Sequence, residues 1–148
     1  MSEPQETINP DETGYELQKR EEINRKGRAY SHSRGDAYEL RTGVFEWEMV
    51  NDKSRFSLGV CNMIGVEQSH TVRGLFSIFQ YVPPEEWQKV QDAFTRTAQH
   101  NIPLDVRCCA IRSDGVRIAV RITGKVTIND EGNPMIEGEI EDVTDPQG

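Results

Sequence analysis

Three consecutive segments in the C-terminal part of the chain alternate between apolar and polar residues, and short turns join them. The segments cover residues 104–112, 116–128 and 134–143, and the turns read SDG and NDEGN. A period of two places successive side chains on opposite faces of a strand, so each segment predicts a strand with one buried face. Turns this short connect antiparallel neighbours. The segments therefore predict an antiparallel sheet.

The second turn also predicts the register of the last two strands. If Ile128 lies opposite Pro134, a basic residue faces an acidic one at two positions. These pairs are Lys125 with Glu137 and Arg121 with Glu141. Opposite charges across a strand pair contribute about 0.2–1 kcal/mol. A slip of one residue would turn the charged side chains toward the core, so the pattern specifies this register strongly.

The preceding segments predict two more strands and several helices. Residues 43–50 alternate between large apolar residues and glutamates, and residues 55–58 form a second short strand. Residues 59–82 are rich in apolar side chains without a clean period, which suits short helical turns. Residues 83–101 have apolar side chains at helical spacing and end at Asn101, before an Ile-Pro pair. The order predicts an α+β fold: a five-stranded antiparallel sheet with short helices and one long helix on one face.

The N-terminal part predicts an extension outside this domain. Residues 1–13 are polar, contain two prolines and are expected to be disordered. Residues 14–42 form a helical extension, in which acidic and basic residues alternate at i,i+4 spacing. Leu17 and Ile23 are the large apolar residues between positions 16 and 26, so the helix needs a partner surface. We expect that this helix supports a homodimer.

Composition excludes several classes of protein. The net charge of −8 argues against nucleic acid or an anionic membrane as the main partner, because both attract positive surfaces. No segment approaches the roughly 20 apolar residues of a membrane span, and the N-terminus lacks the features of a signal peptide. The three cysteines predict neither a disulfide framework nor a zinc site, because no Cys-x-x-Cys spacing occurs. We expect a cytoplasmic protein with reduced thiols.

Four segments, in order, resemble the PAS domain in its variety with PAC-type C-terminal strands. GVFEWEMV is similar to the first strand of the family, with Phe45 at the first aromatic position. FSLGVCNMIG resembles the family segment "ySprfeeilG", with Ser57 at its serine. VPPEEW resembles "VHPDDR" but departs from it at Pro83 and Trp87, and SDG…GEIEDVT resembles "dG…G…DIT". The resemblance covers about residues 43–144.

The resemblance implies a sheet around a small pocket, usual dimerisation and a role as a sensory or protein-interaction module. It assigns signal output to the terminal Asp142-Val143-Thr144, with Asp142 and Thr144 as the output residues. Residues 145–148 would begin a linker to an effector, a kinase or a cyclic-dinucleotide enzyme, outside this chain. We expect a sensory domain that binds a small ligand or partner; the alternative is a ligand-free module for dimerisation or docking.

The sequence shows no evident cofactor motif. The flavin photoreceptors of the family need a cysteine in a motif like "NCRFLQ", and residues 66–76 contain none. Cys61 is expected to pack near the pocket wall. Haem-binding members use a histidine of the long helix, but His100 lies at its far end and is expected in solvent. No nucleophile and base, and no paired carboxylates, are placed together in an apolar setting, so we do not expect an enzyme.

The candidate pocket residues come from the inner faces of the strands, the long helix and the irregular segment. His70 is the better ligand-contact candidate among the histidines, and an exposed loop position is its alternative reading. The inner-face residues first of all form the core, which in this fold is also the pocket wall. The candidates are Trp47, Phe56, Asn62, Met63, His70, Phe76, Phe79, Tyr81, Val90, Phe94, Cys108 and Val120.

Overall fold

The computed structural model describes residues 14–34, 41–68 and 74–145. The predictions for residues 1–13 lie outside these ranges, as do residues 35–40 of the extension and residues 146–148. The predicted domain boundaries therefore stay predictions. In chain order the elements are α1 (Gly14–Arg34), β1 (Thr42–Glu48), β2 (Lys53–Phe56), α2 (Leu58–Ile64), η2 (Leu75–Tyr81), η3 (Pro84–Glu86), α3 (Trp87–His100), β3 (Leu104–Ile111), β4 (Arg117–Ile128) and β5 (Pro134–Asp142).

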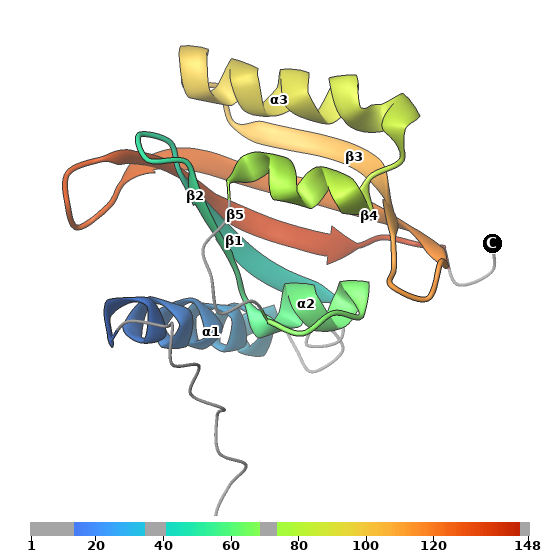
Figure 1. Ribbon diagram of the computed structural model, residues 1–148, viewed down its shortest axis with the longest axis horizontal. Helices are drawn as coiled ribbons and strands as arrows, with labels where there is room; N and C mark the ends of the chain where they lie inside the picture. Colours follow the sequence, from blue (N-terminus) through green and yellow to red (C-terminus); the bar gives the residue numbers. More distant parts are fainter. Residues whose placement is uncertain (1–13, 35–40, 69–73, 146–148) are drawn as a thin grey trace, which may run out of the picture.

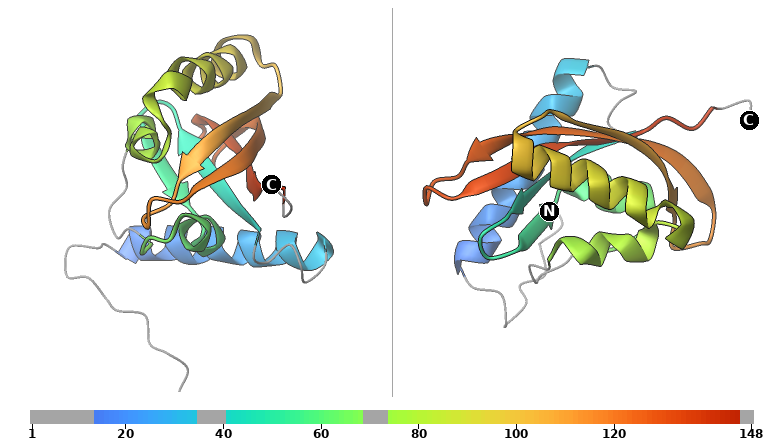
Figure 2. Two further views of the ribbon diagram at one scale, coloured as in Figure 1. Left: turned by 90° about the vertical axis from the view of Figure 1, so that its right-hand side faces the viewer. Right: turned by 90° about the horizontal axis from the view of Figure 1, so that it is seen from above.

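The strands form one antiparallel sheet in the order β2-β1-β5-β4-β3, with β5 in its centre. Helices α2 and α3 and the 3₁₀ helix η2 pack over one face of this sheet (Figures 1 and 2). Helix α1 packs against β1, β2 and α2. This α+β architecture confirms the prediction of a five-stranded sheet with helices on one face and a helix before it.

The predicted register of β4 and β5 is confirmed. Ile128 pairs with Pro134, and both predicted charge pairs lie opposite each other. The close ion pair of Arg121 is nevertheless with Asp105 of β3, at 2.7 Å between Nη2 and Oδ2. Arg121 also lies directly opposite Arg107, so the neighbouring Asp105 carboxylate offsets a like-charge pair. The hydrogen bond that the Asp105 carboxylate accepts from Arg121 lowers the pKa of Asp105.

Helix α3 confirms the predicted long helix and its end. Val90, Phe94 and Thr97 are buried at helical spacing, and Asn101 closes the helix with a left-handed φ of 55°. The predicted first turn is the separate 3₁₀ helix η3. Trp87 is 42% exposed rather than fully inside, and its Nε1 donates to the Val82 carbonyl at 2.7 Å.

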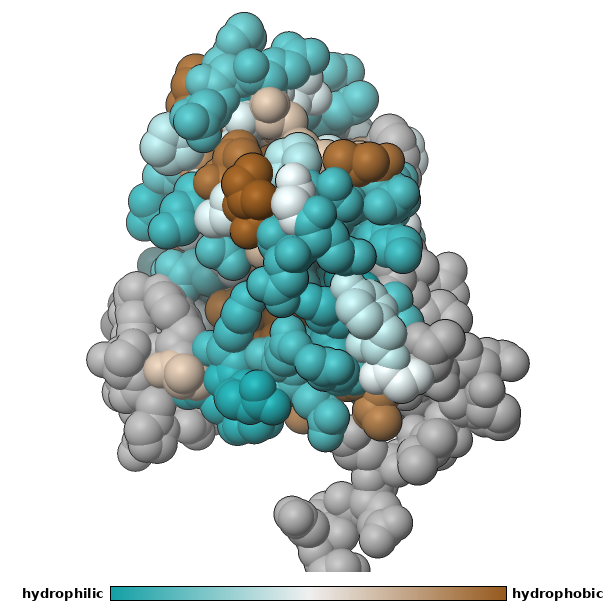
Figure 3. Space-filling model, turned by 90° about the vertical axis from the view of Figure 1, so that its left-hand side faces the viewer, coloured by the Kyte–Doolittle hydropathy of each residue, from teal (hydrophilic) through white to brown (hydrophobic). Residues whose placement is uncertain are grey.

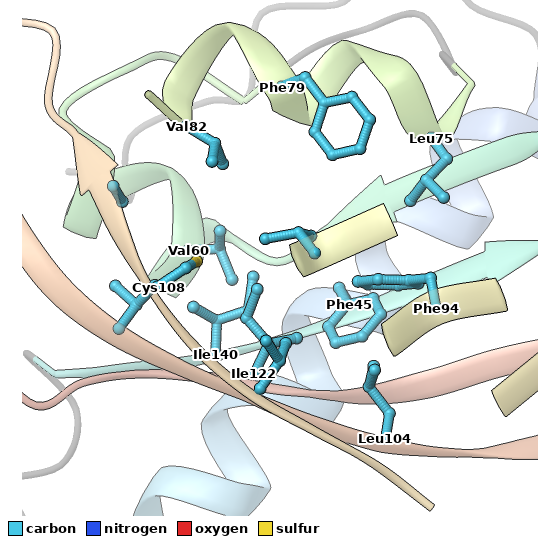
Figure 4. Packing of buried hydrophobic residues seen from close by; sticks show 14 of the residues in the cluster. Phe45, Val60, Leu75, Phe79, Val82, Phe94, Leu104, Cys108, Ile122 and Ile140 are labelled. Carbon is cyan, nitrogen blue, oxygen red and sulfur yellow. The ribbon is translucent and has the colours of Figure 1, made fainter. Parts of the chain in front are cut away.

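The core lies between the inner face of the sheet and α2, η2 and α3 (Figure 4). The rings of Phe45 and Phe94 lie 5.9 Å apart, and those of Trp47 and Phe94 lie 6.1 Å apart in an edge-to-face arrangement. Such aromatic pairs add about 0.5–1.5 kcal/mol beyond the burial of their area. They attach α3 to β1.

The second strand differs from the predicted segment 55–58. It covers Lys53–Phe56, and Ser57 is the N-cap of α2. The Ser57 hydroxyl accepts a hydrogen bond from the Val44 amide at 3.0 Å, which fixes the change from strand to helix against β1. Helix α2 then ends at Gly65, whose φ of 84° is the left-handed conformation that glycine adopts without strain.

The surface view in Figure 3 is mainly hydrophilic, with hydrophobic residues in separate small groups. Single exposed apolar residues are normal on a folded protein. None of the described helices has the length and apolar character needed to cross a membrane. Within the described ranges, no group of three or more histidine, cysteine or acidic residues is placed to hold a metal ion.

Candidate functional site

A cavity of about 170 Å³ lies between the inner face of the sheet, α2 and η2. Its deep wall is entirely apolar and comes from three neighbouring strands. Figure 4 shows Val82 on one side of this space and Cys108 and Ile140 on the other. The deep-wall residues from the strands are Cys108, Ala110, Val120, Ile122 and Ile140.

The side walls come from helical segments far apart in the sequence. Val60 and Met63 of α2 face the cavity, and Ile78 of η2 lies across from them. Ile23 of α1 also lines it and is only 2% exposed. Helix α1, which lies within the predicted extension of residues 14–42, therefore forms part of the cavity wall.

An amide pair, the buried Asn24 and the half-buried Gln68, attaches α1 to the cavity wall. The Asn24 side chain donates to Gln68 Oε1 at 3.0 Å, and its own oxygen accepts from Gln68 Nε2 at 2.8 Å. The same Asn24 oxygen accepts from the amide of Leu58, the first residue of α2, at 2.8 Å. Gln68 Nε2 also donates to the Phe56 carbonyl at 2.9 Å. One side chain thus joins α1, α2 and the segment after α2.

Charged residues lie where α1 meets the sheet. Arg55 of β2 donates to both oxygens of Glu16, at 2.8 and 3.2 Å, and both residues line the cavity. Lys26 approaches Glu46 and Glu137, at 3.6 and 3.8 Å. These two glutamates face each other across β1 and β5, so Lys26 offsets a repulsive pair.

Two thiols line the cavity. Burial raises the pKa of Cys61 and that of Cys108 to about 11, so both are neutral near pH 7. All three cysteines are free. A thiol that stays protonated is a poor nucleophile, so these side chains act as small apolar groups in the wall.

The predicted pocket residues fall into three groups. Those that line the cavity are Phe56, Met63, Tyr81, Cys108 and Val120. Those that lie elsewhere are the core residues Phe79, Val90 and Phe94, the half-buried Trp47 and the exposed Asn62. His70 lies outside the described residues, as does the side chain of Phe76. Contact of any of them with a ligand stays a prediction.

Sequence reasoning missed the part of the cavity that α1 contributes. The cavity is lined by three residues of α1: Glu16, Arg20 and Ile23. The sequence of this helix contains one signal that it makes a buried contact. Ile23 is a large apolar residue in a highly charged helix, which indicates a small buried contact. Nothing in the pattern says which surface receives it.

The end of β5 is tied to two neighbouring strands. The Ala119 amide of β4 donates to the Thr144 hydroxyl at 2.8 Å, and the Thr144 amide donates to Asp142 Oδ1 at 2.9 Å. The Asp142 amide donates to the Arg41 carbonyl at 2.7 Å, just before β1. We call these contacts of residues 142–144 the β5 clip. Its carboxylate and hydroxyl are the two predicted output residues.

No family model and no curated protein sequence matches the chain. Solved structures do match. A sensory box histidine kinase/response regulator of Burkholderia thailandensis is 20% identical, with a TM-score of 0.61 over 81% of this chain and 86% of that one. The N-terminal domain of a Marinobacter aquaeolei diguanylate cyclase with a PAS/PAC sensor has a TM-score of 0.60 at 12% identity, over 70% and 96%.

A structure described for a light-oxygen-voltage domain with a flavin analogue also matches, with a TM-score of 0.55 and 16% identity over 80% of this chain and 90% of that one. At these identities the similarity concerns the fold. The sheet order, the helices over one face and these matches agree with the resemblance seen in the sequence. The chain therefore has the PAS fold.

Proposed function

We propose that this domain senses a small ligand in the apolar cavity and relays its presence through β5 to an effector. The observation that carries the proposal is the position of Ile140. Its side chain lines the cavity, and Asp142 follows two residues later on the same strand, at the start of the β5 clip. A ligand that displaces Ile140 would thereby move the clip.

The relay needs two arrangements of the end of β5. Thr144 joins the clip through hydrogen bonds with Ala119 and Arg41, and residues 142–144 are half-buried. Each such hydrogen bond contributes about 0.5–1.5 kcal/mol net. Ligand binding could therefore shift an equilibrium between a closed and an open clip. The size of the shift equals the difference in the ligand's binding free energy to the two states.

The effector is proposed from the comparisons. Domains of this fold occur in a histidine kinase and in a diguanylate cyclase. We propose that a kinase or a cyclic-dinucleotide enzyme follows this domain in the full-length protein. The domain itself is proposed to have no catalytic activity: within the described residues no histidine lines the cavity, and its thiols have raised pKa values.

A flavin does not fit the residues of this cavity well. Sites for ligands of drug size usually have volumes of about 300–1,000 Å³, which exceeds the 170 Å³ found here. The segment 66–76, where the photoreceptors of the family carry their reactive cysteine, contains no cysteine. His100, the candidate for haem, is exposed at the end of α3 and does not line the cavity. We propose a ligand smaller than either cofactor.

We also propose a homodimer in the cytoplasm. Free thiols suit a reducing compartment. Dimerisation is supported by the family resemblance. Helix α1 finds its partner surface within the same chain, so it does not require a second copy. Sedimentation of the full chain would decide: a dimer mass is expected, and a monomer at every concentration would contradict it.

Substitution at the clip tests the relay. We expect that Asp142→Ala or Thr144→Ala in the full-length protein leaves folding and ligand binding largely intact but uncouples the output from the ligand. Ala119→Gly is a poor control because it changes the strand, so the exposed Asn62→Ala serves instead. A clip variant with an unaltered signal response would count against the relay. Absence of ligand binding in the unmodified protein as well as in the variants would favour the ligand-free docking role.

A further inference from the structure

We infer that the cavity selects a small neutral molecule of mainly apolar character, close in size to a substituted benzene. This inference rests on the proposed function and specifies the chemical class of its ligand. It follows from the volume of the cavity, from its deep wall and from the way its polar lining groups are already bonded.

The volume and the deep wall define the body of the ligand. Apolar cavities of about 150 Å³ in proteins remain dry and bind benzene. The cavity here has about 170 Å³, and its deep wall consists of aliphatic side chains and a thiol, among them Val120, Ile122 and Ile140. An apolar ring or short chain would fill this space and gain about 25 cal/mol per Å² of buried apolar area.

The buried charges at the cavity are matched within the protein. Arg55 lies between Glu16, at 2.8 Å, and Glu46, at 3.8 Å. Arg20, which also lines the cavity, interacts with other groups of the protein. A charged ligand would therefore enter an apolar space in which the charges of Arg55 and Glu16 are already engaged. The cost of burying an ion without a partner is several kcal/mol, which disfavours anions and cations alike.

Three of the neutral polar lining residues are likewise bonded within the protein. Gln68 is held by Asn24 and Phe56, the Ser54 hydroxyl donates to the Gly74 carbonyl at 3.3 Å, and Gln80 Nε2 donates to the Ser77 carbonyl at 2.8 Å. The Nε of Arg55 is a buried donor that makes no hydrogen bond to the described residues. A neutral acceptor on the ligand, such as a carbonyl, hydroxyl or nitro oxygen, would suit this donor without adding charge.

Four probes of similar size test the inference on the full chain. Nitrobenzene and benzoate have nearly the same shape but differ in charge, toluene is neutral without an acceptor, and benzylammonium is a cation. Titration would follow the Met63 methyl signal by NMR, because this side chain lines the cavity. We expect the neutral probes to bind at least ten-fold more tightly than either ion, which corresponds to about 1.4 kcal/mol.

Two variants locate the binding site. Ala110→Ile fills the deep wall and is expected to abolish the Met63 response, with the fold checked by near-UV circular dichroism. Arg107→Ile places the same side chain on the exposed outer face of β3, the strand that carries Ala110, and is expected to bind as the unmodified chain does.

The outcomes separate the inference from the proposed function. Tighter or equal binding of benzoate or benzylammonium would overturn the neutral class, while a ligand-binding sensor would remain. If none of the four probes shifts Met63 at its solubility limit, both the inference and the ligand-sensing function fail. Binding that survives Ala110→Ile in the folded variant would place the probes elsewhere and also overturn the inference.

Discussion

Asn24→Ala is the substitution whose effect follows most directly from the structure. The Asn24 side chain is 8% exposed and makes three hydrogen bonds to Leu58 and Gln68. Its truncation leaves the Leu58 amide and one end of the Gln68 amide without these partners, although Gln68 keeps its bond to Phe56. Each bond contributes about 0.5–1.5 kcal/mol, and a buried unsatisfied group costs about 1–3 kcal/mol. We expect Asn24→Ala to lower the free energy of unfolding by about 2–4 kcal/mol.

A loss of this size is a large part of the 5–15 kcal/mol by which domains are stable. Urea unfolding would measure it, and Asn62→Ala on the exposed side of α2 is the matched control, with a change within about 0.5 kcal/mol. A double-mutant cycle with Gln68→Ala should give a coupling of about 0.5–3 kcal/mol. A loss below about 0.5 kcal/mol for Asn24→Ala, or additive effects in the cycle, would refute the amide pair of Asn24 and Gln68 as the attachment of α1.

Two further predictions concern the sheet. Gly138→Ala should destabilise the domain by more than about 2 kcal/mol or prevent folding, because a Cβ there would lie 1.8 Å from the Thr123 carbonyl oxygen. Gly14→Ala is the control in thermal unfolding, because a Cβ at Gly14 would meet nothing within 4 Å. Equal unfolding temperatures of the two variants would contradict this. The Asp105 carboxyl should titrate below the ordinary value of about 3.9, because Arg121 lowers its pKa. Arg121→Gln should therefore raise the midpoint of the Asp105 titration followed by NMR. An unchanged midpoint would show that Arg121 does not cause the lowered pKa.

The direction of the Asp105 pKa shift sets the pH range in which the pair of Asp105 and Arg121 stabilises the fold. Because the pKa of Asp105 is lowered in the folded state, its pair with Arg121 stabilises the fold above the unfolded pKa. The contribution disappears as the pH falls through the lower, folded value. Both side chains are partly exposed, so salt should screen the effect.

The parts of the fold that depend on local pattern could be predicted. The pairing of Ile128 with Pro134 follows from a period of two and a short turn, since one slip would bury charges. The end of α3 at Asn101 follows from a residue that accepts the left-handed conformation. These features depend on neighbours in the sequence, and the pattern contains them.

The parts of the site that depend on contacts between distant segments could not be predicted. Asn24 and Gln68 lie 44 positions apart, and an amide pair of this kind leaves no periodic signal in the sequence. Trp87 matched the apolar spacing of α3, but the 3₁₀ turn before it places the ring at the surface, stacked on Phe79 at 6.1 Å. Sequence periodicity identified the inner face of the sheet but not which of its residues border open space.

The central claim is that occupation of the cavity reaches the β5 clip. The most direct test follows the Met63 methyl and the backbone amides of Ala119, Asp142 and Val143 by NMR during one titration with toluene. The account predicts that these amides shift with the same midpoint as Met63, and that Ala110→Ile abolishes both responses. Saturation of Met63 with unmoved amides at the clip would contradict it.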